Sequence, residues 1–338
     1  MEREYVGIDL HRRRSVIYRM DEAGNKLDCV RIENDPMRLA SEVGNAPAGA
    51  DVVVEATYGW LVLGGGSPPG DGLRGPPRPP SGHDWGKRRV KNDERDARDL
   101  ADLLRLGRLA ESWIAPREHR ELRELVRFRA KLSNLRTGLK AQVHAVMAKN
   151  GVLPCRNDMW GIGGAAQFDA LELSEAYEHR MEVLRDLIAV YDREINALDR
   201  KIHLRLREDP GYNAVQAIYG VGRVFAAIFV AEIGDVSRFR SAEALCCWAG
   251  LTPAHHESDT KVIRGRITKQ GSKLVRWAAI EAVARYHGGE ALKASYHEIA
   301  ERRGKKRAHV AIARKVLTLV YYGLRDGEIR CLRDRRVA

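Results

Sequence analysis

The first 55 residues carry an apolar pattern that favours a β-sheet. Residues 4–10 (EYVGIDL) predict a strand. The segments SVIYRM and KLDCVRIE, joined by the turn DEAGN, predict a hairpin because apolar residues alternate along both of them. Residues 36–45 predict a short helix, and DVVVE at 51–55 is continuously apolar, as in a strand buried on both faces. The chain therefore begins with an α/β domain that contains a mixed sheet.

The order strand, strand, strand, helix, strand is the order found at the start of ribonuclease H-like folds, and acidic residues occupy its strand ends. Asp9 lies near the end of the first strand and Glu55 ends the later one. Asp93 and Asp96 share one face in the first turn of a predicted helix, with Asp99 as a nearby competitor. Four convergent carboxylates repel one another unless divalent cations such as Mg²⁺ or Mn²⁺ neutralise them, and two such ions can assist substitution at phosphorus. Taken singly, each acid also fits a turn, a helix cap or a solvated surface.

Residues 61–86 interrupt this pattern with eight glycines and six prolines. Such a composition supports neither a regular helix nor a central strand. A surface insertion explains it, and so does a stretch of GC-rich DNA read out of frame between two compensating insertions or deletions.

Helical patterns follow. Asn92 or Asp93 can cap a helix over ERDARDLADLLRLG. Residues 118–149 predict a long basic helix with an apolar stripe, and 175–206 predict a second one. The stripes consist of Leu122, Leu125, Leu132, Leu135, Leu139, Val143 and Val146, and of Leu184, Leu187, Tyr191, Ile195, Leu198 and Ile202. They predict a coiled-coil hairpin, a dimer interface or a plain helical bundle. Residues 262–325 are also expected to be helical.

The charge balance indicates an anionic partner. A net charge of +12 and a pI near 9.6 fit nucleic acid first, and also an anionic membrane surface or an acidic protein. No run of about 18 apolar residues predicts a membrane span, and MEREYVGIDL lacks the apolar core of a signal peptide. Five cysteines without a CxxC pair favour a reducing cytoplasm over a disulfide framework or a zinc knuckle.

Two segments of the C-terminal part suggest phosphate contacts. Gly220 and Gly222 form a Gly-Val-Gly turn between apolar helices, as in a helix-hairpin-helix whose backbone N–H groups hold a phosphate, although a packing turn fits as well. Residues 250–277 carry Ser258 among basic side chains. A serine there can bind a phosphate or attack it, whereas a solvated basic loop is the plainer interpretation. The basic residues are Lys261, Arg264, Arg266, Lys269, Lys273 and Arg276, beside His255 and His256.

These motifs resemble the DEDD transposases of bacterial insertion sequences, in the family numbered one-hundred-and-ten, whose recombinases are guided by a bridge RNA. The matching segments are GIDLHR (7–12), VVEATYGW (53–60), VKNDERDARDLADLLRLGRL (90–109), GVGRVFAAIFVAEIGDVSRFRSAEALCCWAGLTP (220–253) and HESDTKVIRGRITKQGSKLVRW (256–277). The chain departs from the family at 61–86, where the family has a helix and a further sheet strand.

The resemblance implies a RuvC-like domain over 1–112, a coiled-coil region over 113–209 and a mostly α-helical transposase domain over 210–338 with the helix-hairpin-helix-like element. It implies Mg²⁺ on Asp9, Glu55, Asp93 and Asp96, and a nucleophilic Ser258. The expected partners are donor and target DNA, a noncoding guide RNA and further copies of the chain, as a dimer or tetramer in the bacterial cytoplasm. A Holliday-junction resolvase that uses the four acids alone is one alternative, and a non-catalytic nucleic-acid-binding copy is another.

Overall fold

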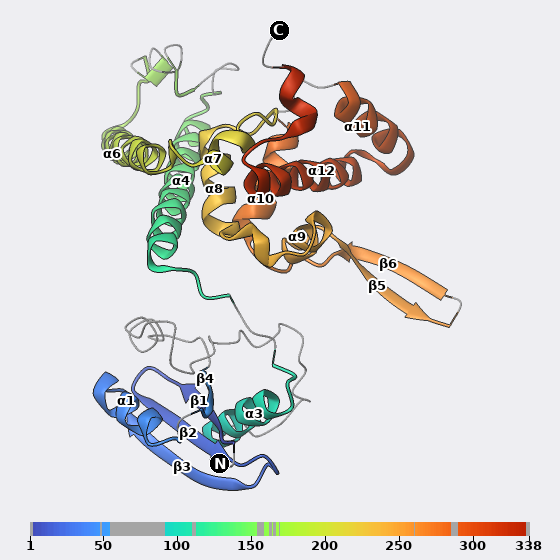
Figure 1. Ribbon diagram of the computed structural model, residues 1–338. Coiled ribbons are helices and arrows are strands. Elements are labelled where there is room, and N and C mark those ends of the chain that lie inside the picture. The colour runs from blue at the N-terminus through green and yellow to red at the C-terminus, as the bar shows by residue number, and fades with distance from the viewer. Residues whose placement is uncertain are drawn as a thin grey trace. The chain divides into compact units, whose positions relative to one another are not determined.

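The computed structural model describes residues 3–47, 49–54, 92–109, 113–153, 159–161, 164, 167–168, 170–259, 261–284 and 290–335. The chain divides into two compact units, unit 1 (Met1–Arg117) and unit 2 (Glu118–Ala338) (Figure 1). The glycine- and proline-rich window at 61–86 lies outside the described residues, so its two explanations remain predictions. No helix in the described ranges is both long and apolar enough to cross a membrane.

Unit 1 is built on a mixed four-stranded sheet with the strand order β3-β2-β1-β4. β1 pairs with β2 in the antiparallel direction and with β4 in the parallel direction. The predicted order of elements and the mixed sheet are therefore confirmed. The elements are β1 (Tyr5–Leu10), β2 (Arg14–Met20), β3 (Lys26–Glu33), α1 (Pro36–Gly44), β4 (Asp51–Val54) and α3 (Asp93–Arg105).

Helix α3 packs directly on the central strand of this sheet. Asn92 caps the helix, because its side chain accepts a hydrogen bond from the Glu94 N–H at 3.1 Å. Ala97, Leu100, Ala101 and Leu104 form the buried face of α3 and share a core with residues of β1, β2 and β4. The other face of the sheet packs against Leu39 of α1. The sheet is therefore covered on both sides, and the first turn of α3 lies beside β1.

The two long helices of unit 2 are α4 (Arg117–Lys149) and α6 (Glu175–Leu206). They run antiparallel, since contacts join the start of α4 to the end of α6 and the reverse. Near the start of α4, Arg205 lies 3.6 Å from Glu121, and Arg129 forms a two-point ion pair with Asp199 at 2.9 and 3.0 Å. Farther along α4, Arg136 pairs with Asp192, and Arg180 donates a hydrogen bond to Gln142 at 3.2 Å. Leu122, Leu132, Val143 and Val146 of the first predicted stripe and Leu184, Ile195 and Ile202 of the second are buried, whereas Leu135 and Leu187 are exposed.

The rest of unit 2 is a helical domain with one protruding hairpin. Its largest core joins α8, α10 and α12. The helices are α7 (Pro210–Val215), α8 (Arg223–Ile233), α9 (Ala242–Trp248), α10 (Lys273–Ala284), α11 (Glu290–Arg303) and α12 (Lys305–Asp326), with 3₁₀ turns at Val236–Arg238 and Arg330–Arg335.

The hairpin corrects the prediction that helix resumes at residue 262. β5 (Pro253–Ser258) and β6 (Lys261–Ile267) pair in the antiparallel direction and project away from α9 (Figure 1). Asp259 has a φ of 51° in the turn, a left-handed conformation that aspartate tolerates better than most residues. Helix begins only at Lys273.

Candidate functional site

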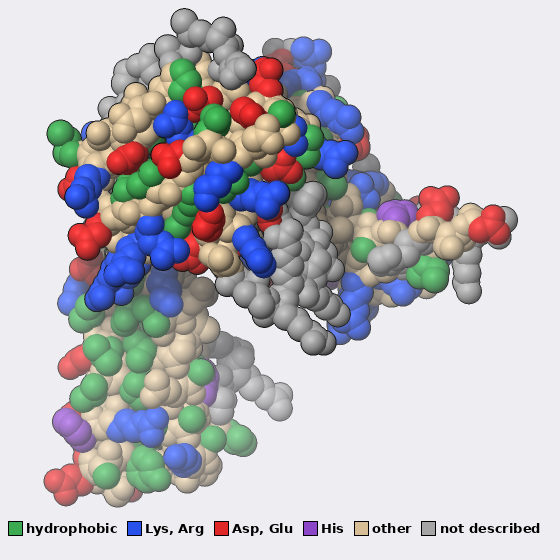
Figure 2. All heavy atoms as spheres, turned by 90° about the horizontal axis from the view of Figure 1, so that it is seen from below, with side chains coloured by type: hydrophobic (Ala, Val, Ile, Leu, Met, Phe, Trp, Pro, Cys, Tyr) green, Lys and Arg blue, Asp and Glu red, His purple; other side chains and the backbone are tan. Residues whose placement is uncertain are grey.

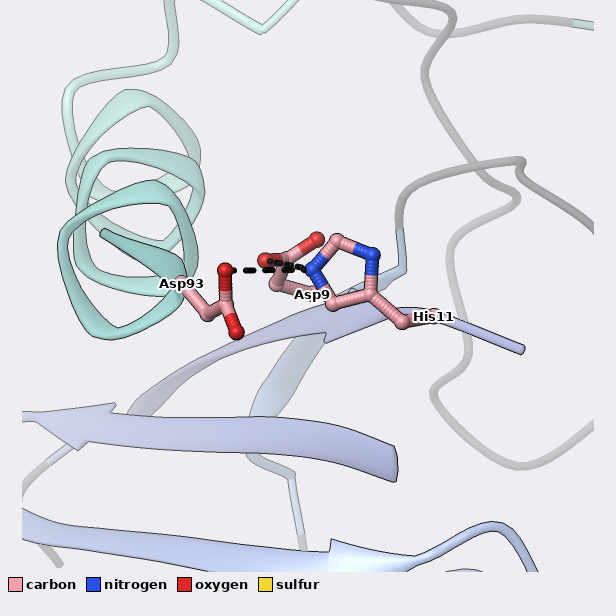
Figure 3. A group of neighbouring side chains, drawn as sticks. All are labelled: Asp9, His11 and Asp93. Carbon is pink, nitrogen blue, oxygen red and sulfur yellow. Dashed lines mark ion pairs between the residues drawn. The ribbon is translucent and has the colours of Figure 1, made fainter. Parts of the chain in front are cut away.

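Two acids and a histidine meet at the edge of the sheet in unit 1. His11 Nε2 lies 3.1 Å from Asp9 Oδ2 and 3.3 Å from Asp93 Oδ1 (Figure 3). All three ligand atoms lie within 4.8 Å of one another. The Asp9 side chain is 2% exposed, whereas His11 and Asp93 are 44% and 46% exposed. The group therefore combines one buried carboxylate with two groups that solvent can reach.

Gly7 allows helix α3 to approach β1 so closely that Asp93 lies beside Asp9. A Cβ atom at position 7 would lie 2.1 Å from the carbonyl oxygen of Ala97 and 2.7 Å from the Ala101 nitrogen. No side chain fits there, so the glycine lets the α3 backbone approach β1 at this distance. Asp93 is the first residue of α3. The close approach thus brings the helix terminus to the strand end.

Of the other two predicted acids, the structure describes only Asp96. β1 and β4 are parallel neighbours, and Ile8 pairs with Val54. Glu55 follows Val54 in the sequence, but it lies outside the described residues. Asp96 is half-buried in the first turn of α3 and is not one of the three residues that meet. The predicted four-acid set stays a prediction, with Asp9 and Asp93 brought together by the fold.

Sequence reasoning missed His11, although a signal was present. Residues two apart on a strand point to the same side of a sheet. His11 follows Asp9 by two positions at the end of β1, so the alternation already placed the imidazole beside the carboxylate.

The donor set suits a divalent cation. Carboxylate oxygens are the ligands that Mg²⁺ prefers, and an added imidazole is compatible with Mn²⁺. The imidazole nitrogen lies between the two carboxylates. The residues present therefore fit the predicted metal, with Asp9 and Asp93 as its oxygen ligands.

Ser258 is exposed at the outer end of β5, where it pairs with Lys261 across the hairpin. Its neighbour Glu257 is also exposed. Adjacent strand residues point to opposite faces, so Glu257 points away from Ser258. This arrangement presents the serine hydroxyl to a large substrate and disfavours Glu257 as its base.

The predicted phosphate contacts divide into internal and surface groups. A Cβ at Gly220 would lie 2.2 Å from the carbonyl oxygen of Ala282, so this glycine serves helix packing. Gly222 is the N-cap of α8, and a Cβ there would meet no atom within 4 Å. Arg276 donates to the carbonyl oxygens of Ala249 at 3.0 Å and of Gln270, so its guanidinium stabilises a loop. Arg266, Lys269 and Lys273 are exposed, and the Arg264 side chain lies outside the described atoms.

Comparison with known proteins places these elements in a family. The sequence model of the transposases of the IS116/IS110/IS902 family matches residues 212–297, and that of the DEDD transposases of the IS110 type matches residues 81–150. Both models describe transposases of insertion sequences. The matched regions contain Asp93 and Asp96 in one case and Ser258 in the other.

Relatives carry consistent names. The transposase for insertion sequence element IS1111A of Coxiella burnetii is 27% identical over 63% of this chain and 61% of its own length. A "probable family 20 transposase" of Pseudomonas aeruginosa is 26% identical over 52% of this chain and 51% of its own. The pilin gene-inverting protein of Moraxella bovis is 31% identical over 42% of this chain and 46% of its own. This chain therefore spans about half the length of the curated relatives it matches.

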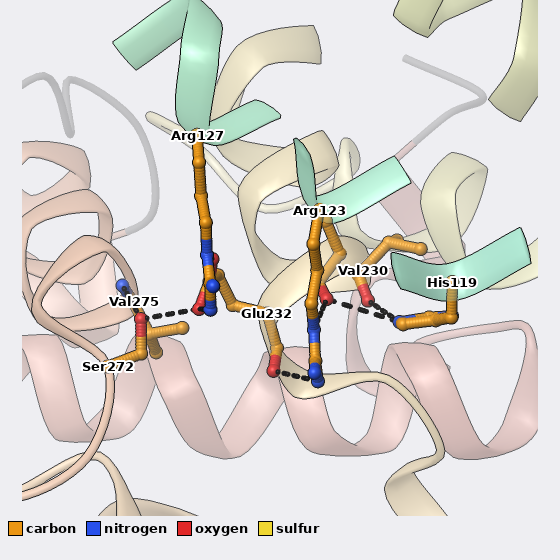
Figure 4. Close-up of polar contacts among 8 residues, drawn as sticks. His119, Arg123, Arg127, Val230, Glu232, Ser272 and Val275 are labelled. Atoms are coloured by element: carbon orange, nitrogen blue, oxygen red, sulfur yellow. Dashed lines mark hydrogen bonds and ion pairs between the residues drawn. The ribbon is translucent and has the colours of Figure 1, made fainter. Parts of the chain in front are cut away.

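Unit 2 also contains a buried polar cluster that sequence reasoning missed. Glu232 of α8 is 4% exposed and accepts two hydrogen bonds from Arg127 of α4, at 2.6 and 3.0 Å, and one from the Ser272 hydroxyl at 3.0 Å (Figure 4). Burial alone would raise the pKa of Glu232, but Arg127 and Ser272 outweigh it and lower that pKa.

The same region of α4 satisfies the last carbonyls of α8. Arg123 donates to the carbonyl oxygens of Ala231 and Glu232 at 2.7 and 3.1 Å, and His119 donates to that of Val230 at 3.2 Å (Figure 4). Burial lowers the pKa of His119. We call the contacts of Arg123, Arg127, Glu232 and Ser272 the α4–α8 clamp. The clamp holds α8 against α4 and, through Ser272, against the start of α10.

Proposed function

We propose that this chain is a transposase that cuts and rejoins DNA when an insertion sequence moves. The observation that carries the proposal is the convergence of Asp9, His11 and Asp93 at the strand edge of unit 1. The matched family models, which cover Asp93 and Ser258, support it. The family names support DNA as the substrate, and the charge of +12 supports an extended polyanionic partner.

In this proposal Asp9, Glu55, Asp93 and Asp96 hold Mg²⁺ or Mn²⁺. The metal, when bound, polarises a phosphate oxygen and lowers the pKa of a coordinated oxygen. Asp9 is fixed by β1 and Asp93 by the start of α3, so both are held before a substrate arrives. The His11 imidazole lies against both carboxylates and helps to hold them in place.

Ser258 is proposed as the nucleophile. Its Oγ attacks a backbone phosphorus, a serine–phosphate ester forms, and the displaced sugar oxygen leaves as a hydroxyl. A neighbouring histidine takes the serine proton, since Glu257 points to the opposite face of the hairpin. Arginine side chains brought to the attacked phosphate stabilise the negative charge that develops on its oxygens. Donor and target DNA, a noncoding guide RNA and further copies of the chain are the proposed partners.

The experiment is a recombination assay on labelled DNA with Mg²⁺ and RNA from the flanking DNA. Asp9→Asn and Asp93→Asn should reduce strand cleavage by more than about 100-fold, because each removes a proposed metal ligand. Asp102→Asn on the same helix is the matched control and should retain activity, because Asp102 pairs with Arg105 away from the site. Ser258→Ala should remove the slow-migrating, protease-sensitive adduct that the parent protein forms with DNA.

The outcomes separate the alternatives. Cleavage that needs the acids but survives Ser258→Ala, with no adduct, indicates a resolvase that uses metal chemistry alone. Binding without cleavage by the parent protein indicates a non-catalytic nucleic-acid-binding copy. Full cleavage by both aspartate variants would refute the metal site.

A further inference from the structure

A pocket lies at the base of the hairpin in unit 2, away from Ser258 at its outer end. Thr252, His255, Thr268, Cys247 and Arg314 contribute to its walls, and its volume is about 730 Å³. The hairpin supplies His255, and α9 and α12 supply Cys247 and Arg314. Figure 2 shows the hairpin protruding from the molecule, with lysine and arginine side chains near its base. No acidic side chain is among the described residues that line this pocket.

Two polar atoms in this pocket are buried without a hydrogen-bond partner among the described residues: Arg314 Nε and Thr268 Oγ1. Arg314 also forms no ion pair within 4.0 Å in the described ranges. A buried polar atom without a partner destabilises the folded chain. Both atoms can donate a hydrogen bond, so an acceptor with a negative charge suits each of them.

The surroundings favour a phosphate as that acceptor. A phosphate offers several oxygen acceptors, and arginine binds it more readily than it binds neutral groups. His255 and Thr252 add further donors to the same wall. The chain from residue 261 to 338 contains 20 lysine and arginine residues against 7 acidic ones, so a polyanion is attracted to this region.

We propose that this pocket binds a backbone phosphate of a nucleic-acid strand that runs along the hairpin towards Ser258. The proposal rests on the proposed function in that the ligand is the enzyme's nucleic acid. Arg314 and Thr268 are the donors that contact the phosphate. The pocket positions the strand and takes no part in bond breaking.

The test uses the pocket's own thiol as a reporter in the full-length protein. Cys247 is exposed in the pocket wall, and Cys331 is exposed elsewhere. Alkylation of each cysteine by iodoacetamide is followed by peptide mass spectrometry, without ligand and with a DNA duplex, a single-stranded DNA, an RNA or inorganic phosphate. A bound strand should slow alkylation of Cys247 and leave Cys331 unchanged. The arm with inorganic phosphate reports whether a free ion suffices.

Variants separate this pocket from general binding. Arg314→Met should weaken nucleic-acid affinity about tenfold and remove the protection of Cys247. Lys315→Met is the matched control, because it removes the same charge from the neighbouring position of α12, where the lysine donates to Ser295. Thr268→Val replaces an unpartnered hydroxyl by a methyl group of similar size, so it should fold normally and reduce protection by a smaller amount.

Each result has a definite meaning. Filter binding measured in parallel shows whether nucleic acid binds at all, and its absence would refute the proposed function. Normal binding with unchanged Cys247 alkylation would overturn the pocket proposal alone. Equal effects of Arg314→Met and Lys315→Met, together with full protection in Thr268→Val, would overturn it as well. Protection by inorganic phosphate but by no strand would show a free-anion site instead.

Discussion

Gly7 sets the distance between β1 and α3, and this distance determines whether Asp93 reaches Asp9. In Gly7→Ala the new methyl group would meet the Ala97 carbonyl at 2.1 Å, so α3 must move away from the strand. Overpacking of this kind costs about 1–3 kcal/mol. We expect faster amide hydrogen exchange in β1 and weaker Mn²⁺ binding than in the parent chain.

Gly138→Ala is the control for this substitution. A Cβ at position 138 meets nothing within 4 Å, and alanine stabilises a helix interior by about 0.5–1 kcal/mol relative to glycine. The control should therefore leave Mn²⁺ binding unchanged. Parental exchange rates and Mn²⁺ affinity in Gly7→Ala would show that the sheet and helix tolerate the methyl group.

At this scale the sequence predicted the positions of Asp9 and Asp93 because each is tied to a clear local signal, a strand end and a capped first turn. For His11 the signal appears only when the alternation of side chains in β1 is extended one residue past Leu10. Arg276 shows the opposite difficulty. Its basic neighbours suggest a phosphate contact, but carbonyl oxygens of a folded loop occupy the guanidinium. Partners far along the chain cannot be predicted from charge alone.

The α4–α8 clamp makes unit 2 sensitive to acid. Glu232 has a lowered pKa, so its contribution to the free energy of unfolding is full above the ordinary value of 4.5 and is lost as pH falls through the folded value below it. Glu232→Gln should lower the free energy of unfolding by about 1–3 kcal/mol at pH 7. The gap between parent and variant should shrink below pH 4.5 in denaturant titrations.

Glu208→Gln serves as the control, because Glu208 is 85% exposed and pairs only with its neighbour Arg207 among the described residues. Exposed pairs contribute about 0–1 kcal/mol. A gap for Glu232→Gln that stays constant from pH 7 to pH 3 would contradict the proposed role of its charge.

The long helices were predictable because their apolar spacing persists over many turns, as in α4 and α6. The hairpin was not. Its strands carry histidine, arginine and glycine at positions where buried strands carry apolar residues, and its turn has Asp259 without a following glycine. Main-chain pairing in β5 and β6 therefore gives little signal in side-chain patterns.

The net positive charge of the chain lies in unit 2. Unit 1 has 19 basic and 19 acidic residues, whereas unit 2 has 39 basic and 27 acidic ones. The resemblance placed a domain boundary after residue 112, and the structure divides the chain after Arg117. Within unit 2, α12 begins with Lys305, Lys306 and Arg307, all exposed, with no acidic residue in the first turn. We call these three residues the α12 basic run.

The α12 basic run is expected to lower the free energy of unfolding and to strengthen nucleic-acid binding. Cations at a helix N-terminus oppose the helix dipole, so replacing all three residues by glutamine should raise the free energy of unfolding by about 0.5 kcal/mol or more. The same triple variant should bind DNA and RNA more weakly, and the slope of log affinity against log salt should fall by up to about 3, since each lost phosphate contact removes about 0.9. The control replaces three exposed arginines of unit 1, Arg31, Arg38 and Arg108, and should leave the slope unchanged. An equal change of slope in both triple variants would mean that binding follows total charge, and an unchanged slope in the α12 variant would place the phosphate contacts elsewhere in unit 2.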